Sequence, residues 1–148
     1  MKQTVMGLLS LVALSIAIPA AARDDRLKFP VDAALAKGQN YKEKLDPQIK
    51  LYFGKPSKLK VAKTIGEWTS NKKTNAFNKS DQEACNIAFI SAAVSLQDRA
   101  KREGGNAVIN IHSVYKNDKF ESPTEYLCGA GSTMAGVALR GTVVTLPK

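Results

Sequence analysis

Residues 80–105 read SDQEACNIAFISAAVSLQDRAKREGG, and this stretch determines the fold that the sequence predicts. Small and apolar residues recur along it every four positions, which is the spacing of one face of an α-helix. Ser80 and Glu83 have the spacing of a capping box, and Gly104 with Gly105 ends the pattern. The sequence therefore predicts a helix over residues 81–103 whose small-residue face packs closely on a sheet. The residues of this face are Ala84, Ala88, Ala92, Leu96 and Ala100.

Segments on both sides of this helix have the patterns of strands. Residues 106–115 (NAVINIHSVY) alternate two sets of side chains and predict a strand with one buried face. Residues 126–146 are glycine-rich and β-prone, and they predict the last strands. Before the helix, residues 49–53 and 59–68 predict a first hairpin. Residues 69–79 are polar and have no period, so they predict a loop.

The remaining segments complete a single predicted domain over residues 23–148. Residues 23–30 predict an extended lead-in, residues 31–36 a short helix, and residues 116–123 a polar turn. The sequence therefore predicts the α+β class. We expect a mostly antiparallel sheet of four to five strands, arranged as two hairpins, with one long helix packed on one face.

The first 22 residues have the three parts of a secretory signal peptide. Lys2 provides a positive start, residues 5–18 form an uncharged stretch of 14, and Ala20, Ala21 and Ala22 precede the cleavage point. A membrane-spanning helix needs roughly 20 apolar residues, so this stretch is too short for a permanent anchor. No cysteine stands at the cleavage point for lipid attachment. We therefore expect an exported, soluble periplasmic protein with neither a lipid anchor nor a later membrane span.

The two cysteines, Cys85 and Cys128, are an even count in a chain that is expected to be exported, where disulfides form. They could meet and tie the helix to the final strands. Such a bond would contribute roughly 4 kcal/mol by restricting the unfolded chain. The alternative is a reactive pair, because a helix start can lower a thiol pKa. The C-x-x-C spacing of thiol exchange is absent.

The chain is basic, with 22 Lys and Arg against 13 Asp and Glu, and loss of Lys2 with the leader leaves a net charge of +8. Seven lysines gather across the first predicted hairpin and the loop after it, with Glu67 the only acidic residue among them. Phe53, Trp68 and Phe77 are interleaved with these lysines. Lysines beside aromatic rings can bind phosphates, acidic sugars or stacked bases. A solvated face that keeps the protein soluble is the alternative interpretation. The seven are Lys55, Lys58, Lys60, Lys63, Lys72, Lys73 and Lys79.

Two pairs of motifs resemble a known family. Residues 95–100 (SLQDRA) are followed by residues 104–108 (GGNAV), and residues 128–131 (CGAG) by residues 136–142 (GVALRGT). Over the whole expected mature chain, the sequence resembles a family of small exported proteins of proteobacteria that often carry the label "excinuclease ATPase subunit". That label requires a G-x-x-x-x-G-K-[ST] loop for phosphates. The sequence has none, so we expect no nucleotide partner.

More distantly, the helix, the glycine stop and the Asn-Ala-Val strand resemble the YbjQ-type heavy-metal-binding fold and the Rcs envelope-stress sensor lipoprotein. The sensor joins its helix and strands by disulfides, so this resemblance implies a bond between Cys85 and Cys128. The chain lacks the lipoprotein cysteine and has two cysteines where the sensor has four. The resemblance therefore implies a fold and a compartment, and neither a lipid anchor nor Rcs signalling.

Few residues indicate chemistry. His112 is the only histidine, so no other imidazole could form a Ser-His or Cys-His catalytic pair, and its place in the strand predicts a half-exposed residue. A metal site would need His112 with carboxylates or both thiolates, which a disulfide removes. Residues 129–136 (GAGSTMAG) partly match a dinucleotide loop, but Met134 stands at the third glycine position. We interpret this run as a glycine-bent strand packed closely under the helix.

Together these observations favour a non-catalytic periplasmic domain that binds or senses an envelope component through the basic hairpin. The component would be an anionic ligand, such as an envelope polymer, or a protein partner. The alternative is a small-ligand or metal-binding periplasmic protein that uses His112 or the thiols. We predict no cofactor, and the sequence contains no motif for paired catalytic carboxylates or an activated nucleophile.

Overall fold

The structure is a computed structural model that describes residues 16–17, 22–41 and 43–148. Most of the expected leader, residues 1–22, lies outside these described residues. The elements confirm the α+β class. In chain order they are β1 (Asp25–Pro30), α1 (Val31–Lys37), the 3-10 helix η1 (Gly38–Asn40), β2 (Lys50–Phe53), β3 (Lys63–Asn75), α2 (Asp81–Arg102), β4 (Ala107–Tyr115), β5 (Asp118–Phe120), β6 (Glu125–Ala130) and β7 (Met134–Thr145).

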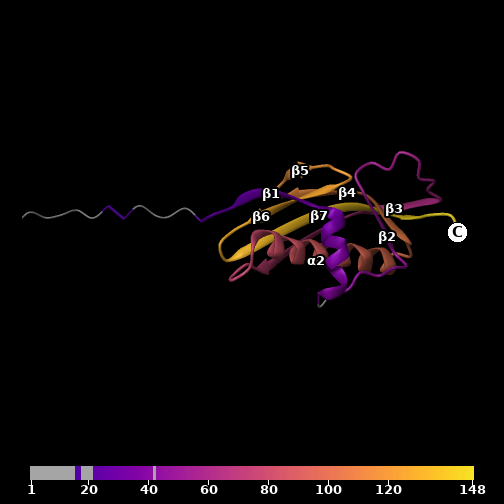
Figure 1. Cartoon of the computed structure of the whole chain (residues 1–148). Coiled ribbons are helices and arrows are strands. Elements are labelled where there is room, and N and C mark those ends of the chain that lie inside the picture. Colours follow the sequence, from indigo (N-terminus) through magenta and orange to yellow (C-terminus); the bar gives the residue numbers. More distant parts are fainter. Residues whose placement is uncertain (1–15, 18–21, 42) are drawn as a thin grey trace, which may run out of the picture.

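The sheet is organised around β7 (Figure 1). Strand β3 pairs along one edge of β7, while β6 and β4 share the other edge. Strand β1 lies outside β6, and β2 lies outside β4 and runs parallel to it. The described residues thus form a mixed sheet of seven strands, which corrects the expected mostly antiparallel sheet of four to five.

The first predicted hairpin is wrong. Leu51 of β2 pairs with Val108 of β4, and Trp68 of β3 pairs with Gly141 of β7, so β2 and β3 are not neighbours. The physical reason is the connection between them, because residues 54–62 form a long irregular segment and not a tight turn. The predicted loop over residues 69–79 is also wrong in its first part, since β3 continues to Asn75. Its polar Thr, Asn and Lys residues suit a strand at the edge of a sheet.

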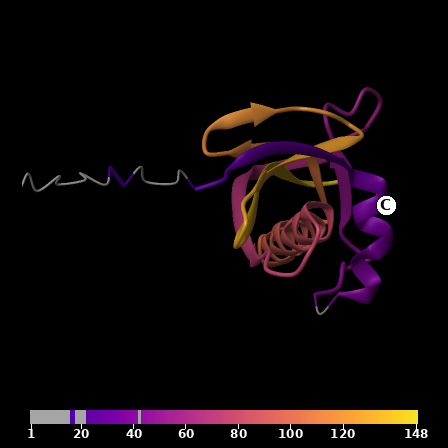
Figure 2. The ribbon, with the colours of Figure 1, turned by 60° about the vertical axis from the view of Figure 1, so that its left-hand side comes forward.

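Helix α2 begins and ends close to the prediction. The Ser80 hydroxyl accepts a hydrogen bond of 3.1 Å from the Glu83 amide, which is one half of the expected capping box. Gly104 has a φ of +80°, a left-handed conformation that glycine adopts without strain and that ends the helix. Figure 2 shows α2 end-on, with the strands curved around it. The predicted small-residue face is fully buried against the sheet.

The short helix predicted over residues 31–36 is confirmed as α1, although the expected fold class counted only the long helix. Helix α1 is a two-turn segment whose Val31 and Ala34 are buried, and it packs against α2. The expected single helix on one sheet face is therefore corrected to two helices. Among the described residues, no helix is long and apolar enough to cross a membrane.

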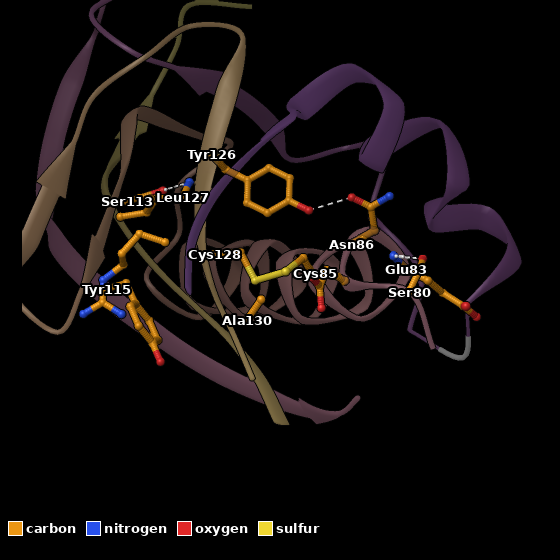
Figure 3. Close-up of a disulfide and its surroundings, with 12 residues drawn as sticks. Ser80, Glu83, Cys85, Asn86, Ser113, Tyr115, Tyr126, Leu127, Cys128 and Ala130 are labelled. Atoms are coloured by element: carbon orange, nitrogen blue, oxygen red, sulfur yellow. Dashed lines mark hydrogen bonds between the residues drawn. A yellow bond between two sulfur atoms is a disulfide. The ribbon is translucent and has the colours of Figure 1, made fainter. Parts of the chain in front are cut away.

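The disulfide between Cys85 and Cys128 confirms the predicted pairing and joins α2 to β6, with Cα atoms 5.9 Å apart (Figure 3). Beside it, the ring of Tyr126 stacks on Phe89 at 4.2 Å between centroids. The Tyr126 hydroxyl donates a 2.6 Å hydrogen bond to Oδ1 of Asn86. Burial raises the pKa of Tyr126 well above its ordinary value, so the hydroxyl stays protonated and able to donate. This cluster fixes the position of the helix on the sheet.

The glycine run after Cys128 forms the β6–β7 hairpin, in which Ala130 and Ala135 belong to the core beneath α2 as expected, whereas Gly129 and Gly136 face the other side of the sheet. Gly129 pairs with Gly136, and a Cβ at either position would collide with the ring of Tyr115. Tyr115 lies on the side of β6 opposite the disulfide (Figure 3). The glycines therefore make room for an aromatic ring on the outer face of the sheet, which we define as the face turned away from α2.

Strand β4 departs from the predicted alternation. One extra residue at Asn110 shifts the register against both β2 and β7, which makes a β-bulge. Val108 and Ile111 consequently both belong to the core beneath α2, although the sequence pattern placed them on opposite faces. His112 is buried on the outer face, with 7% of its surface exposed, so the prediction of a half-exposed residue is wrong.

Candidate functional site

The structure places the predicted lysines in two separate groups. Lys55, Lys58, Lys60 and Lys63 lie in the segment before β3 and at its first residue, and all four are exposed. The other three lie at or beyond the far end of β3. Lys63 and Lys73 are ten strand residues apart, which corresponds to about 33 Å. One ligand of ordinary size therefore cannot contact both groups.

The second group is dispersed further by the geometry of the strand. Lys72 lines a hollow beside α2 with Arg102, whereas Lys73 lines one beside Tyr115. Lys79 donates a hydrogen bond of 3.1 Å to the carbonyl oxygen of Asn75. Because side chains alternate between the faces of a strand, Lys72 and Lys73 point to opposite sides of the sheet. These three lysines do not form one surface.

The interleaved aromatic residues have structural positions. Trp68 packs against the core, and the guanidinium of Arg99 lies 5.5 Å from its ring centroid. Phe53 packs on Phe89 with ring centroids 5.6 Å apart. Phe77 is 65% exposed and lies beyond β3. Trp68 therefore supports the contact between α2 and β3, and of the three interleaved aromatic rings Phe77 alone is largely exposed.

Lys60 of the first group lines a cavity together with Lys50. We call it the lysine cavity; its volume is about 430 Å³, and its lining includes Lys50, Tyr52, Leu59, Lys60, Asn106 and Leu146. Ile49, Leu51 and Phe53 belong to the core. Strand alternation therefore turns Lys50 and Tyr52 outward. The segment over residues 54–62 then places Leu59 and Lys60 against them.

Two side-chain pairings hold the walls of the lysine cavity in place. The Asn106 side chain donates to the carbonyl oxygen of Leu146 at 3.1 Å and accepts from the amide of Leu146 at 2.7 Å. On the opposite face of the sheet, the Gln97 amide donates to the carbonyl oxygens of Asp46 and Ile49, which anchors the entry to β2. Gln97 and Asn106 lie in residues 95–100 and 104–108, and their role in this structure is to position backbone.

The charged side chains that line the lysine cavity are all positive. No acidic side chain lines it, and the chain has no Asp or Glu between Asp46 and Glu67. Within the described residues, neither Lys50 nor Lys60 makes an ion pair, whereas other lysines on this protein do. Unpaired ammonium groups at a cavity attract phosphate and carboxylate groups, and the field is focused by the low-dielectric walls. Tyr52 and Leu59 add apolar surface on which a sugar ring or an acyl group can pack.

Sequence reasoning named Lys60 and missed Lys50. The signal that could have found Lys50 is the alternation of residues 48–53, in which every second residue is apolar and the others face outward. The cavity also needs Asn106 and Leu146, which are far from it in the chain. A purely local pattern could not bring these residues together.

Metal binding gains no support from the part of the chain that the structure describes. No group of three His, Cys, Asp or Glu side chains is positioned there to hold an ion, and both thiols are in the disulfide.

Comparison with models of known protein families, with curated proteins and with solved structures finds no match to this chain. The function is therefore argued from the site alone.

Proposed function

We propose that this protein is a non-catalytic, exported domain of the bacterial periplasm that binds an anionic envelope polymer at the lysine cavity. The observation that carries the proposal is the cavity's lining, where Lys50 and Lys60 stand without an acidic partner beside Tyr52 and Leu59. Lys55, Lys58 and Lys63 are exposed lysines close to Lys60 in the sequence, and they add to the positive charge of this part of the chain. Phosphates of lipopolysaccharide and carboxylates of acidic glycans are the matching groups.

Retention on immobilised polygalacturonate in a sodium chloride gradient tests this function. The wild-type protein should bind at low salt and elute as the salt rises, because each lysine contact releases bound counterions. The double variant Lys50→Gln, Lys60→Gln should elute at clearly lower salt. Repeating the measurement with lipopolysaccharide vesicles compares phosphate with carboxylate as the preferred group.

The matched control is Lys72→Gln, Lys73→Gln, which removes the same charge from the other end of β3. It should elute close to the wild-type protein, since its lysines lie outside the cavity. Equal shifts for the two double variants would show that net charge alone causes retention, and the proposal would then be wrong. If the wild-type protein is retained on neither matrix but is retained on an immobilised acidic protein, the ligand of the lysine cavity is a protein partner and not a polymer.

A further inference from the structure

A second hollow, separate from the lysine cavity, lies on the outer face of the sheet where β3, β7 and β4 run side by side. Strand register places Thr69, Arg140 and His112 in one row across these three strands. The β4–β5 hairpin contributes Asn117 and Lys119 to its wall. We call this the His112 hollow; its volume is about 340 Å³, and its polar lining residues are Glu67, Asn110, His112, Asn117, Lys119 and Arg140.

The bulge in β4 sets the orientation of the imidazole. Asn110 has a φ of +52°, a left-handed conformation that asparagine tolerates better than most residues. In this conformation its carbonyl oxygen lies 2.8 Å from Nδ1 of His112. A carbonyl oxygen only accepts, so Nδ1 carries the proton and Nε2 of a neutral ring is an acceptor. Among the described residues, neither Nε2 of His112 nor the buried Oδ1 of Asn110 has a hydrogen-bond partner.

The cationic side of the hollow is also preorganised. Nε of Arg140 donates a 2.9 Å hydrogen bond to the Thr69 hydroxyl, which fixes the guanidinium. Glu67 lies 3.8 Å from the same nitrogen, and within the described residues the terminal nitrogens of Arg140 have no protein hydrogen bond. The lining side chains Arg140, Lys119 and Glu67 carry a net charge of +1, and Lys119 also lies 4.0 Å from a carboxylate oxygen of Glu121, which does not line the hollow. The positive charge available to a ligand is therefore mainly that of the Arg140 guanidinium.

We propose that the His112 hollow binds a small molecule that carries both an oxyanion and hydroxyl groups, of the chemical class of sugar phosphates and sugar acids. The terminal N–H groups of Arg140 bind the oxyanion in the two-pronged geometry that suits phosphate and carboxylate, and Lys119 adds charge. Oδ1 of Asn110 and Nε2 of His112 accept hydrogen bonds from the hydroxyl groups. The ligand thereby supplies the donor that each unpartnered acceptor lacks.

Proton NMR provides a direct readout because His112 is the only histidine, and its ring Hε1 proton gives one signal. The purified protein is titrated with glucose 6-phosphate, inorganic phosphate or glucose at pH 7 and constant ionic strength. Glucose 6-phosphate should shift the signal saturably at millimolar concentration, and inorganic phosphate more weakly. Glucose alone should leave the signal unchanged, because it lacks the oxyanion.

Two variants separate the parts of the proposal. Arg140→Gln should raise the Kd for glucose 6-phosphate by about tenfold or more, since a charge-assisted hydrogen bond pair is lost. Asn110→Gly keeps the left-handed backbone and removes Oδ1, so it should abolish the preference for glucose 6-phosphate over inorganic phosphate. Lys72→Gln, which removes one positive charge outside both the lysine cavity and the His112 hollow, is the matched control and should bind as the wild-type protein does.

Three outcomes would overturn the assignment. The first is the absence of a saturable shift in the wild-type protein at millimolar glucose 6-phosphate. The second is a Kd for glucose 6-phosphate that is unchanged in the Arg140→Gln variant, provided that the His112 signal of this variant shows the native fold. The third is equal affinity of the wild-type protein for glucose 6-phosphate and inorganic phosphate, which would remove the hydroxyl part. The result is independent of retention on polygalacturonate, because the two sites share no lining residue.

Discussion

Gly129 and Gly136 owe their identity to the ring of Tyr115. A Cβ at either position would collide with this ring, and the guanidinium carbon of Arg26 lies 4.6 Å from the ring centroid. Gly129→Ala should therefore lower the free energy of unfolding by about 1–3 kcal/mol, because the extra methyl forces the ring to move. Urea denaturation followed by circular dichroism measures the loss.

A double-mutant cycle identifies the cause of this loss. In a Tyr115→Ala background the space above Gly129 is vacated, so adding Gly129→Ala should cost much less than it does in the wild-type protein. If the alanine costs the same in both backgrounds, the strain is in the backbone and not against the ring. Gly136→Ala should follow the same pattern, since its Cβ would also meet Tyr115.

Asn110 shows why the faces of β4 could not be predicted. The alternating pattern of residues 106–115 is real, but it counts every residue, and one extra residue reverses the faces beyond it. Asn110 was a signal for a bulge, because asparagine is enriched at positive φ. Nothing in the sequence distinguished it from an ordinary outward-facing asparagine. His112 was consequently expected to be half-exposed and is instead buried.

The link between α2 and β6 is the element contact with the clearest energetic consequence. Cys85 and Cys128 close a loop with a sequence separation of 43, so the bond should restrict the unfolded chain by about 4 kcal/mol. The variant Cys85→Ala, Cys128→Ala should lose stability of this order in urea denaturation. The comparison is the reduced wild-type protein, which should lose a similar amount. A loss below about 1 kcal/mol in both would mean that the packing of Phe89 and Tyr126 alone fixes the helix.

Predictability differed sharply between helices and strands. Helix α2 was predicted to within a residue, because its capping residue, its period and its glycine stop are all local signals. The pairing of strands is not local. Strand β2 (residues 50–53) pairs in parallel with β4, although β3 and α2 lie between the two strands in the sequence. The sequence pattern of a strand does not indicate which other strand it pairs with. This is why the strands of the first predicted hairpin were located but paired wrongly.

The arrangement of the charged side chains in space also depends on strand pairing, which the sequence does not reveal locally. Composition predicted a basic protein, and the cluster of lysines before the helix predicted one basic surface. The length of β3 separates this cluster into two ends of the sheet, where Lys60 lines the lysine cavity and Lys72 and Lys73 line two other hollows. The sequence did not predict that Arg140 and Lys119 lie beside His112. Strand register brings Arg140 next to His112, and the β4–β5 hairpin brings Lys119 there.

The response of the protein to acid should depend on Asp24, which joins the start of the domain to the β4–β5 hairpin. Hydrogen bonds from Lys116 and Arg26 lower the pKa of Asp24 to about 2, below its ordinary value of 3.8. A depressed pKa in the folded state means that this carboxylate stabilises the fold above its ordinary pKa. That contribution is lost progressively as the pH falls from about 4 towards 2.

Asp24→Asn should therefore lower stability at pH 7 and give a shallower loss of stability between pH 4 and 2 than the wild-type protein shows. Asp46 has a pKa lowered by its hydrogen bond from Lys101, so the wild-type slope should not vanish in this variant. Asp24→Asn, Asp46→Asn should flatten it further. Urea denaturation at a series of pH values measures the slopes, and parallel curves for the wild-type protein and Asp24→Asn would show that the carboxylate of Asp24 does not stabilise the fold.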